Sequence, residues 1–489
     1  MSYSETKTRA FASVKWALLA SVLPRLWTPL VTLILARVLV PEDFALIGLA
    51  TVFISFLQMV QQLGLGTALI QCQRSPQDVA DGIFWINLLS SGLVYGVLWA
   101  AAGYIGAFYA EARLVLVVRV LGLQLILAAL GAVHSALLER AIQYQKLFWP
   151  RIMPALVPPL LALSLAWAGM RHWALVAGSL AGCALQTALL WQQSAWVPAF
   201  RLPWNHVRSL LGFGLLASLE TFVNWGHNYG DNAIAGRFLS RSDFGVYITS
   251  FSLVILVLGI AVLPVAPIAY ASFSRLAVNR QELVRAYLQL NRLVALVCFP
   301  LAVGICVVAT PFVRLAFKPQ WAGMAPVLQI LALMPGLSFL FLLNPELFRA
   351  CGRPQINVLV GALSMGYMAV ALLIAAPFGV VRLTWARFSV GAVFTVVHIY
   401  LPIRLLKLDK DYFWSAARSP AVAAALMALL LVPGRELMGP YAGPAGWAKL
   451  GCLVAGGAII YAGAIVLMDR SLVRLGIQAV QRALIAHTA

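Results

Sequence analysis

Long apolar runs separated by short polar connections follow one another along almost the whole chain. Each run approaches the roughly 20 residues that an α-helix needs to cross a bilayer. The pattern therefore predicts an all-α, polytopic membrane protein with about 14 transmembrane helices. Their expected ranges are 14–39, 43–64, 80–108, 112–138, 149–169, 172–193, 207–236, 242–269, 286–309, 323–346, 354–377, 381–404, 415–433 and 446–468.

Composition agrees with this pattern, because hydrophobic residues make up 62% of the 489 residues and charged residues only 10%. Such a balance excludes an ordinary soluble domain. The net charge of +19 does not indicate nucleic acid as a partner, because the basic residues are distributed over alternate connections. If the N-terminus is cytoplasmic, inward connections carry about twice as many basic residues as outward ones, which predicts that both termini are cytoplasmic. The six cysteines have no paired spacing, so neither a disulfide framework nor a metal site is indicated.

An unusual polar stretch, residues 220–232, lies within the predicted helix 207–236. With 3.6 residues per turn, Glu220, Asn224, His227 or Asn228, and Asp231 fall on one face. An ionisable side chain near the bilayer centre costs roughly 2.5 to 3.5 kcal/mol, so such residues usually face a bundle interior or a wet cavity. The stripe is typical of a translocation path, and the structural alternative is a hydrogen-bond network between helices.

The first predicted helix carries an arginine between two prolines, Pro24-Arg25 and Pro29. Proline removes a backbone donor, and a broken membrane helix is tolerated only where protein or water satisfies the freed carbonyls. Arg25 is therefore expected to point into a cavity, with an ion pair to an acid such as Glu220 as the alternative.

The chain contains an internal repeat, since residues 36–46 and 236–246 share Arg, Leu, Asp and Phe at equivalent positions. In both copies the aspartate is expected to cap a helix start. An even number of helices per repeat gives two lobes of the same orientation, with the binding site between them. The predicted organisation is a cytoplasmic N-terminus (1–13), a six-helix lobe (14–195), an interfacial linker (196–206), a second six-helix lobe (207–405), two accessory helices (406–468) and an amphipathic cytoplasmic tail (469–489).

Several short motifs occur in order and resemble a known family: Leu-Ala-Arg-Val-Leu-x3-Asp-Phe (35–44), Gly-Leu-Gly-Thr-Ala-Leu-Ile-Gln (64–71) and Asp-Asn-x2-Ala-Gly-Arg-Phe-Leu (231–239). The chain resembles bacterial polysaccharide flippases of the lipopolysaccharide/colanic-acid type, in the multidrug/oligosaccharidyl-lipid/polysaccharide exporter superfamily. The resemblance implies a multi-pass protein of the bacterial inner membrane that is not an enzyme. By alternating access it would move an undecaprenyl-pyrophosphate-linked oligosaccharide from the cytoplasmic to the periplasmic leaflet for cell-surface polysaccharide export.

This substrate suggests roles for the intramembrane polar residues. The guanidinium fork suits pyrophosphate oxygens, and the candidates are Arg25 first, then Arg119 and Arg292. Polar and aromatic groups suited to sugars are Gln58, Gln62, Asn224, Trp225, Asn228 and Tyr229. Residues suited to coupling with H⁺ or Na⁺ are Glu220, His227 and Asp231. No cofactor is expected; the expected partners are the lipid-linked oligosaccharide, membrane lipids and polysaccharide polymerase or export proteins, with the chain functional as a monomer.

Three other functions remain open. An ion-coupled small-molecule or multidrug extruder of the same superfamily would favour an acidic cavity, and Arg25 counts against it. A membrane polysaccharide polymerase or glycosyltransferase needs positioned acid and base groups and usually a large external loop, which the chain does not have. A purely structural scaffold would not explain the polar stripe. Direct ATP hydrolysis is not indicated, because no Walker motif is present.

Overall fold

The structure is a computed structural model that describes residues 27, 31–61, 76–141, 143–200, 204–261, 265–409 and 411–476. Within these ranges, only the backbone is described for 76–79, 204–220, 260–261, 338–341, 413 and 415. Arg25 and Gln62 lie outside the described residues, and the side chain of Glu220 does too.

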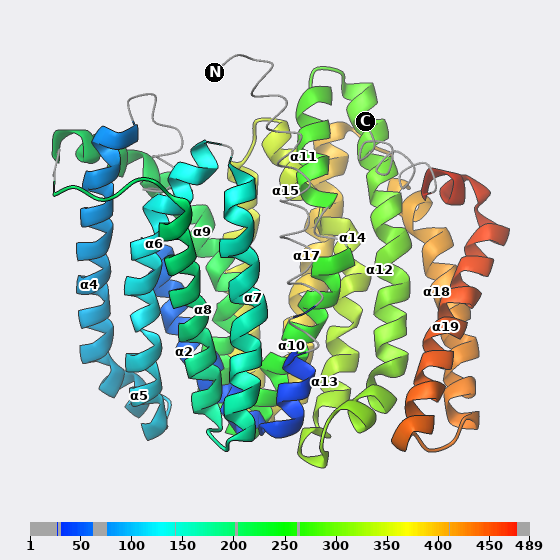
Figure 1. The fold of residues 1–489 in the computed structure, drawn as a ribbon. Helices are drawn as coiled ribbons and strands as arrows, with labels where there is room; N and C mark the ends of the chain where they lie inside the picture. Colours follow the sequence, from blue (N-terminus) through cyan, green and yellow to red (C-terminus); the bar gives the residue numbers. More distant parts are fainter. Residues whose placement is uncertain are drawn as a thin grey trace. The chain divides into compact units, whose positions relative to one another are not determined.

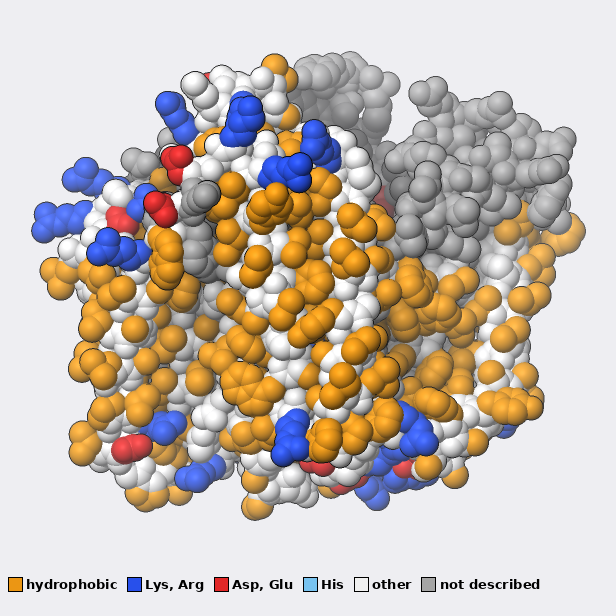
Figure 2. Space-filling model, turned by 180° about the vertical axis from the view of Figure 1, so that it is seen from behind, with side chains coloured by type: hydrophobic (Ala, Val, Ile, Leu, Met, Phe, Trp, Pro, Cys, Tyr) orange, Lys and Arg blue, Asp and Glu red, His pale blue; other side chains and the backbone are white. Residues whose placement is uncertain are grey.

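The described residues form α-helices and two short 3-10 helices, with no strand among them, which confirms the predicted all-α membrane fold. Eleven of these helices are long and apolar enough to cross a membrane. The helix α9 (Trp204–Phe238) is also long enough, but it carries the polar residues 224–232 and is not one of the eleven. The total of about 14 stays a prediction. On the face seen in Figure 2, hydrophobic side chains cover a broad middle band, and Lys and Arg side chains lie toward its upper and lower edges.

The chain divides by its internal contacts into two compact units, residues 1–248 and 249–489, with the division inside α10 (Arg241–Ala261). The predicted lobe boundaries stay a prediction. The first unit contains, besides α9 and a helical segment at 31–38, the helices α2 (Pro41–Gln61), α4 (Pro76–Phe108), α5 (Ala112–Leu121), α6 (Leu123–Arg140), α7 (Tyr144–Trp167) and α8 (His172–Gln193) (Figure 1).

Small residues bring α7 and α8 together in this unit. A Cβ atom added at Gly178 of α8 would lie 2.8 Å from the Cβ of Ala162 and 3.0 Å from the carbonyl oxygen of Pro158. Without a hydrocarbon-water driving force between helices in lipid, such close packing is a main source of helix association. The four prolines of α7 remain within a continuous helix, because neighbouring structure covers its backbone on this side.

The second unit is arranged around one long helix, α12, which begins after an Asn279 cap whose side-chain oxygen accepts from the N–H of Gln281 at 3.1 Å. The helix α12 packs against α14, α18 and α19. The helices of this unit are α11 (Val265–Leu276), α12 (Arg280–Ala316), η1 (Pro319–Trp321), α13 (Met324–Leu331), α14 (Leu333–Phe341), α15 (Asn344–Ala350), α16 (Gln355–Ala375), η2 (Ala376–Phe378), α17 (Val380–Leu406), α18 (Tyr412–Leu437) and α19 (Gly443–Met468).

The two repeated motifs begin α2 and α10. As predicted for the first repeat, the carboxylate of Asp43 accepts from the backbone N–H of Val40 at 3.3 Å. In the second repeat the prediction was wrong, because Ser240 caps α10: its hydroxyl accepts from the N–H of Asp243 at 3.1 Å and donates to the carboxylate of Asp243 at 2.8 Å. Each aspartate thus fixes the turn that precedes its own helix.

Glycines allow these two turns to pack directly on each other within the first unit. A Cβ added at Gly245 would overlap the backbone carbonyl of Pro41, which cannot move without shifting the start of α2. Similarly, a Cβ at Gly48 would meet the side chain of Ile248, and one at Gly236 would overlap the side chain of Leu49. The close contact of α2 with α9 and α10 therefore depends on the absence of side chains at these positions.

Gly245→Ala is expected to destabilise the first unit by about 1–3 kcal/mol, because the added methyl group must displace backbone. Thermal unfolding of the purified protein in detergent measures this effect. Gly366→Ala is the matched control: Gly366 lies in α16 with no atom within 4 Å of the added Cβ, so its unfolding temperature should not fall. An equally stable Gly245→Ala variant would contradict the close approach of the two turns.

Candidate functional site

The polar face of α9 is open in one part and covered in another. Asn224 and Asn228 are exposed, and the side-chain amide of Asn228 donates to the backbone carbonyl of Asn224 at 2.8 Å. Asp231 is fully buried, and its carboxylate accepts from the hydroxyl of Tyr247 of α10 at 2.7 Å. The same helical face thus offers open hydrogen-bonding groups over one turn and a buried carboxylate on the next turn.

An aromatic ladder lies beside this face. The indole N–H of Trp225 donates to the hydroxyl of Ser55 of α2 at 3.0 Å, which fixes the ring against α2. The Trp225 and Tyr229 rings stack with centroids 6.5 Å apart, and Phe56 packs edge-on to Trp225 at 4.9 Å. The Nδ1 atom of His227 lies 3.1 Å from the carbonyl oxygen of Val223, one turn earlier in α9. The structure therefore places Trp225, Tyr229 and the two asparagines on the same stretch of helix.

Gln58 lies in a different cavity of the first unit, with a volume of about 470 Å³. It is lined by α2, α6, α7, α8 and the segment 31–38, and among the described side chains its lining includes none from α9. Gln124 and Ser179 form a hydrogen bond of 2.6 Å in its wall. Gln186 also lines this cavity, a contribution that the sequence analysis missed because one glutamine in an apolar helix gives no periodic signal.

The two described candidate arginines already have partners. The guanidinium of Arg119 stands 4.1 Å from the ring centre of Trp99 and donates to the carbonyl of Trp99 at 3.3 Å. In the second unit, Arg292 pairs with Asp469 at 2.7 Å, just beyond the end of α19. Partial burial opposes ionisation of Asp469, but hydrogen bonds from Ser471, the N–H of Leu472 and Arg292 hold its pKa below the usual value.

A further intramembrane arginine, Arg387 of α17, is buried with its guanidinium 5.5 Å from the ring centre of Phe251. The sequence signal was present, because a lone arginine inside an apolar span is rare and expensive. Composition alone did not rank this arginine above the others. The structure distinguishes Arg387 from the other arginines by burying its side chain in the second unit.

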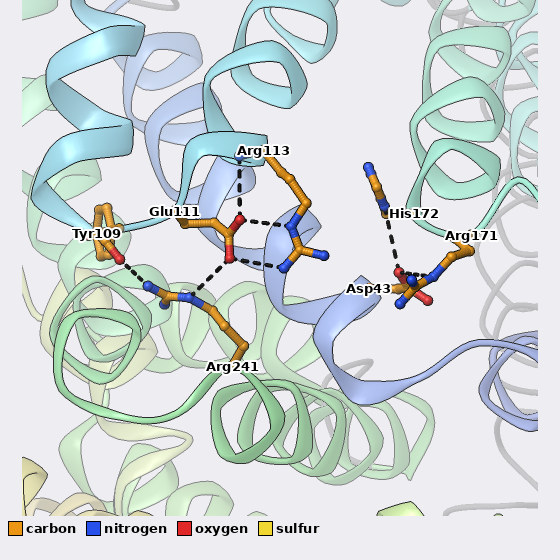
Figure 3. A network of polar contacts seen from close by, with 7 residues as sticks. All are labelled: Asp43, Tyr109, Glu111, Arg113, Arg171, His172 and Arg241. Carbon is orange, nitrogen blue, oxygen red and sulfur yellow. Dashed lines mark hydrogen bonds and ion pairs between the residues drawn. The ribbon is translucent and has the colours of Figure 1, made fainter.

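Charged residues from four turns gather at one end of the first unit (Figure 3). Glu111, between α4 and α5, is bound by Arg113 at 2.8 Å and by Arg241, at the start of α10, at 3.6 Å. Arg241 also donates to the backbone carbonyls of Gly236, at 2.7 Å, and of Tyr109. Through these bonds, Arg241 ties the start of α10 to the end of α4.

A second ion cluster lies beside the first, where Asp43 faces Arg171 at 3.5 Å and His172 at 3.6 Å (Figure 3). Both clusters use short turns whose partners are far away in sequence, so helical periodicity gave no sign of these pairings. The hydrogen bond from Arg113 lowers the pKa of Glu111, although burial opposes this shift. Burial raises the pKa of Tyr109 to about 12, with Arg241 opposing.

Comparisons with known proteins agree on both family and fold. The model of a family described as "Polysaccharide biosynthesis protein" matches residues 34–326. The teichuronic acid biosynthesis protein TuaB of Bacillus subtilis (strain 168) is 24% identical over 417 residues, covering 83% of this chain and 84% of the relative. The lipopolysaccharide biosynthesis protein WzxC of Escherichia coli (strain K12) is 19% identical over 341 residues, covering 67% of each chain.

Two solved structures have the same fold. The lipid II flippase MurJ in an inward closed conformation superposes with a TM-score of 0.77 at 12% identity, covering 94% of this chain and 100% of the flippase. A multidrug resistance MATE transporter of the MOP superfamily, in an inward-facing conformation, has a TM-score of 0.61 at 14% identity, covering 81% of this chain and 99% of the transporter. At such identities the likeness establishes the fold.

Glu111→Gln is expected to lower the stability of the first unit by about 1–3 kcal/mol at neutral pH, because Arg241 loses its charged partner in a partly buried position. Since the folded-state pKa of Glu111 is depressed, its contribution is present at neutral pH and is lost as pH falls through that low pKa. The stability difference between the variant and the original protein should therefore stay constant near neutrality and shrink only in acid.

Thermal unfolding across a pH series measures this difference. Glu436→Gln is the matched control. The side chain of Glu436 is 72% exposed, and its ion pair with Arg435 is long, at 4.0 Å, so removing its charge should cost little stability. A Glu111→Gln variant that is no less stable than this control would contradict the cross-link between α4 and α10.

Proposed function

This chain belongs to the polysaccharide biosynthesis protein family, and we propose that it acts there as a flippase for a lipid-linked oligosaccharide. The substrate is an undecaprenyl-pyrophosphate-linked oligosaccharide, moved from the cytoplasmic to the periplasmic leaflet of a bacterial inner membrane. Both termini are cytoplasmic, and the chain is a transporter without enzymatic chemistry. The observation that carries the proposal is the open pair Asn224 and Asn228 beside Trp225 on a membrane-length helix of this family member.

The α9 face provides suitable chemistry for sugars. Exposed side-chain amides supply both donors and acceptors for hydroxyl groups, and the neighbouring indole supplies an apolar ring face. The bond from Trp225 to Ser55 keeps that ring in one orientation. This combination of amides and a fixed indole suits an oligosaccharide, because the orientation of the indole is set before the substrate binds.

Coupling to a proton or sodium gradient is assigned to Asp231. Its carboxylate is buried on the same helical face as the asparagines, and it faces the phenol of Tyr247. Buried carboxylates inside membrane proteins mark ion pathways. A change of charge at Asp231 would alter its bond to α10, and thereby the contact of α9 with the first turn of the second repeat.

Arg25 remains the proposed ligand of the pyrophosphate. Arg119 and Arg292 are weaker proposals, because one stacks on Trp99 and the other pairs with Asp469. A cation that already has a close partner must give it up before it binds a phosphate, and this exchange lowers the gain.

A multidrug extruder is the second candidate, and the fold shared with a MATE transporter favours it. One experiment separates the two functions. The purified protein is reconstituted into liposomes with a fluorescent polyprenyl-pyrophosphate oligosaccharide, and exposure of the glycan on the opposite leaflet is scored with and without an imposed proton or sodium gradient. Protein-dependent exposure supports the flippase, whereas movement of a cationic dye without any movement of the glycan lipid refutes it.

Among three arginine variants in that assay, Arg25→Gln is expected to reduce transport at least about tenfold, equivalent to about 1.4 kcal/mol in the binding of the transported state. Arg119→Gln and Arg292→Gln are expected to retain most transport, because these arginines are engaged elsewhere. Membrane abundance of each variant is the control. Full transport by Arg25→Gln would move the phosphate site to another cation.

Asp231→Asn is expected to remove the gradient dependence of transport, because an amide cannot change charge with a proton or sodium ion. Tyr247→Phe keeps the carboxylate but removes the hydroxyl that donates to it. Because the carboxylate itself remains, the gradient dependence of transport should persist in this variant. An unchanged gradient response in Asp231→Asn would assign this residue to structure alone.

A further inference from the structure

An apolar groove of about 460 Å³ runs along the first unit between α2, α4 and α9. Its walls are aromatic and come from Phe53, Phe56, Tyr104, Phe108, Tyr109 and Trp225. Tyr104 is 82% exposed and Phe108 57% exposed, so the groove opens along the outside of the unit. The polar asparagine face and this groove share α9, and Trp225 lies at their junction.

The groove is already formed in the structure, because its rings hold one another in place. Phe108 packs edge-on to Tyr109 at 4.9 Å, and Phe53 packs edge-on to the same ring at 6.0 Å. The hydroxyl of Tyr109 donates to the carbonyl of Ala233 on α9 at 3.1 Å. A preformed apolar groove can bind a hydrocarbon chain without the entropic cost of ordering the side chains that line it.

A positive charge stands at one end of the groove. The guanidinium of Arg237 lies 5.5 Å from the ring centre of Phe108, and its side chain is exposed. Arg241 is occupied by Glu111, whereas the guanidinium of Arg237 lies over the ring of Phe108, which lines the groove. With a rise of 1.5 Å per residue, Trp225 and Arg237 are about 18 Å apart along α9. The groove thus combines an apolar length with a cationic end.

We propose that this groove holds the polyprenyl chain of an anionic lipid, with Arg237 on the phosphate that carries that chain, while Arg25 stays the proposed ligand of the second phosphate of the pyrophosphate. A prenyl phosphate has one branched apolar chain and one terminal anion. The chain matches the aromatic groove, and the anion matches the guanidinium at its end. A two-chain phospholipid would fill the channel with only half of its hydrocarbon. The inference rests on the proposed function, because it supplies a place for the lipid part of the substrate.

Photo-crosslinking tests the site without transport. The full chain in lipid nanodiscs is labelled with polyprenyl pyrophosphate that lacks a glycan and carries a diazirine on its chain, and the labelled peptides are identified by mass spectrometry. Phosphatidylglycerol with a diazirine on one acyl chain, and a neutral polyprenol with the same diazirine, are the comparison probes. Labelling of α4 and α9 by the pyrophosphate probe, well above that by the other two, is the expected result.

Two variants and two matched controls sharpen the test. Ala101→Trp fills the groove from α4 and should abolish the labelling, while Ala107→Trp, at an exposed α4 position outside the lining, should not. Arg237→Gln should weaken labelling about threefold to fivefold, as for an exposed charge contact. Arg382→Gln is its control, because Arg382 stands 5.0 Å from Phe378 in the second unit and should leave labelling unchanged.

Equal labelling of the groove by phosphatidylglycerol would overturn the prenyl assignment, and equal labelling by neutral polyprenol would overturn the role of Arg237. Groove labelling that is lost in Ala101→Trp, in a protein that moves no glycan lipid in liposomes, would support the site and refute the flippase. Translocation that persists in Ala101→Trp without any groove labelling would overturn the groove as the path of the substrate's lipid chain and leave the flippase standing.

Discussion

The close contact between the first turns of α2 and α10 constrains the arrangement of the first unit. Gly245 lies against the Pro41 carbonyl, and Gly48 and Gly236 leave room for side chains of the facing helices. Because a lipid environment provides little hydrophobic drive for helices to associate, contact at this distance depends on small residues. It also brings the start of the second repeat against the start of the first. As a result, α9 packs along α2, which lies beside its polar face.

Charge reinforces this packing at the same end. Glu111, carried by the turn between α4 and α5, binds Arg113 of its own turn and Arg241 of the second repeat. The carboxylate is only 11% exposed and Arg241 19%, so water screens the pair less than it would a surface pair. Two cations around one carboxylate keep it ionised, and the spare bonds of Arg241 go to backbone carbonyls. Close packing and ion pairs therefore stabilise the same end of the first unit, where α2, α4 and α10 meet.

From this joint, α9 presents two different surfaces. One carries the open amides of Asn224 and Asn228 and leads to the buried Asp231, while the other contributes to the aromatic groove. Trp225 takes part in both, since Ser55 fixes its indole between them. A lipid-linked sugar has the same division into a polar and an apolar part. In the proposed function, α9 offers one surface to each part.

The sequence by itself determined the membrane class of the protein and its all-α fold, but the expected span 323–346 is divided among α13, α14 and α15, and the expected span 242–269 covers both α10 and α11. A long apolar run in a bilayer must satisfy its own backbone, so composition and length suffice to specify helices. Spacing also singled out the polar residues of α9, because a helical period is local information. Only the tertiary structure decided the partners: Arg292 with Asp469, Arg119 over Trp99, Glu111 with Arg241, and Gln58 in one cavity with Gln124. These pairings join residues far apart in the chain, and they follow from how helices pack, which neither periodicity nor composition encodes.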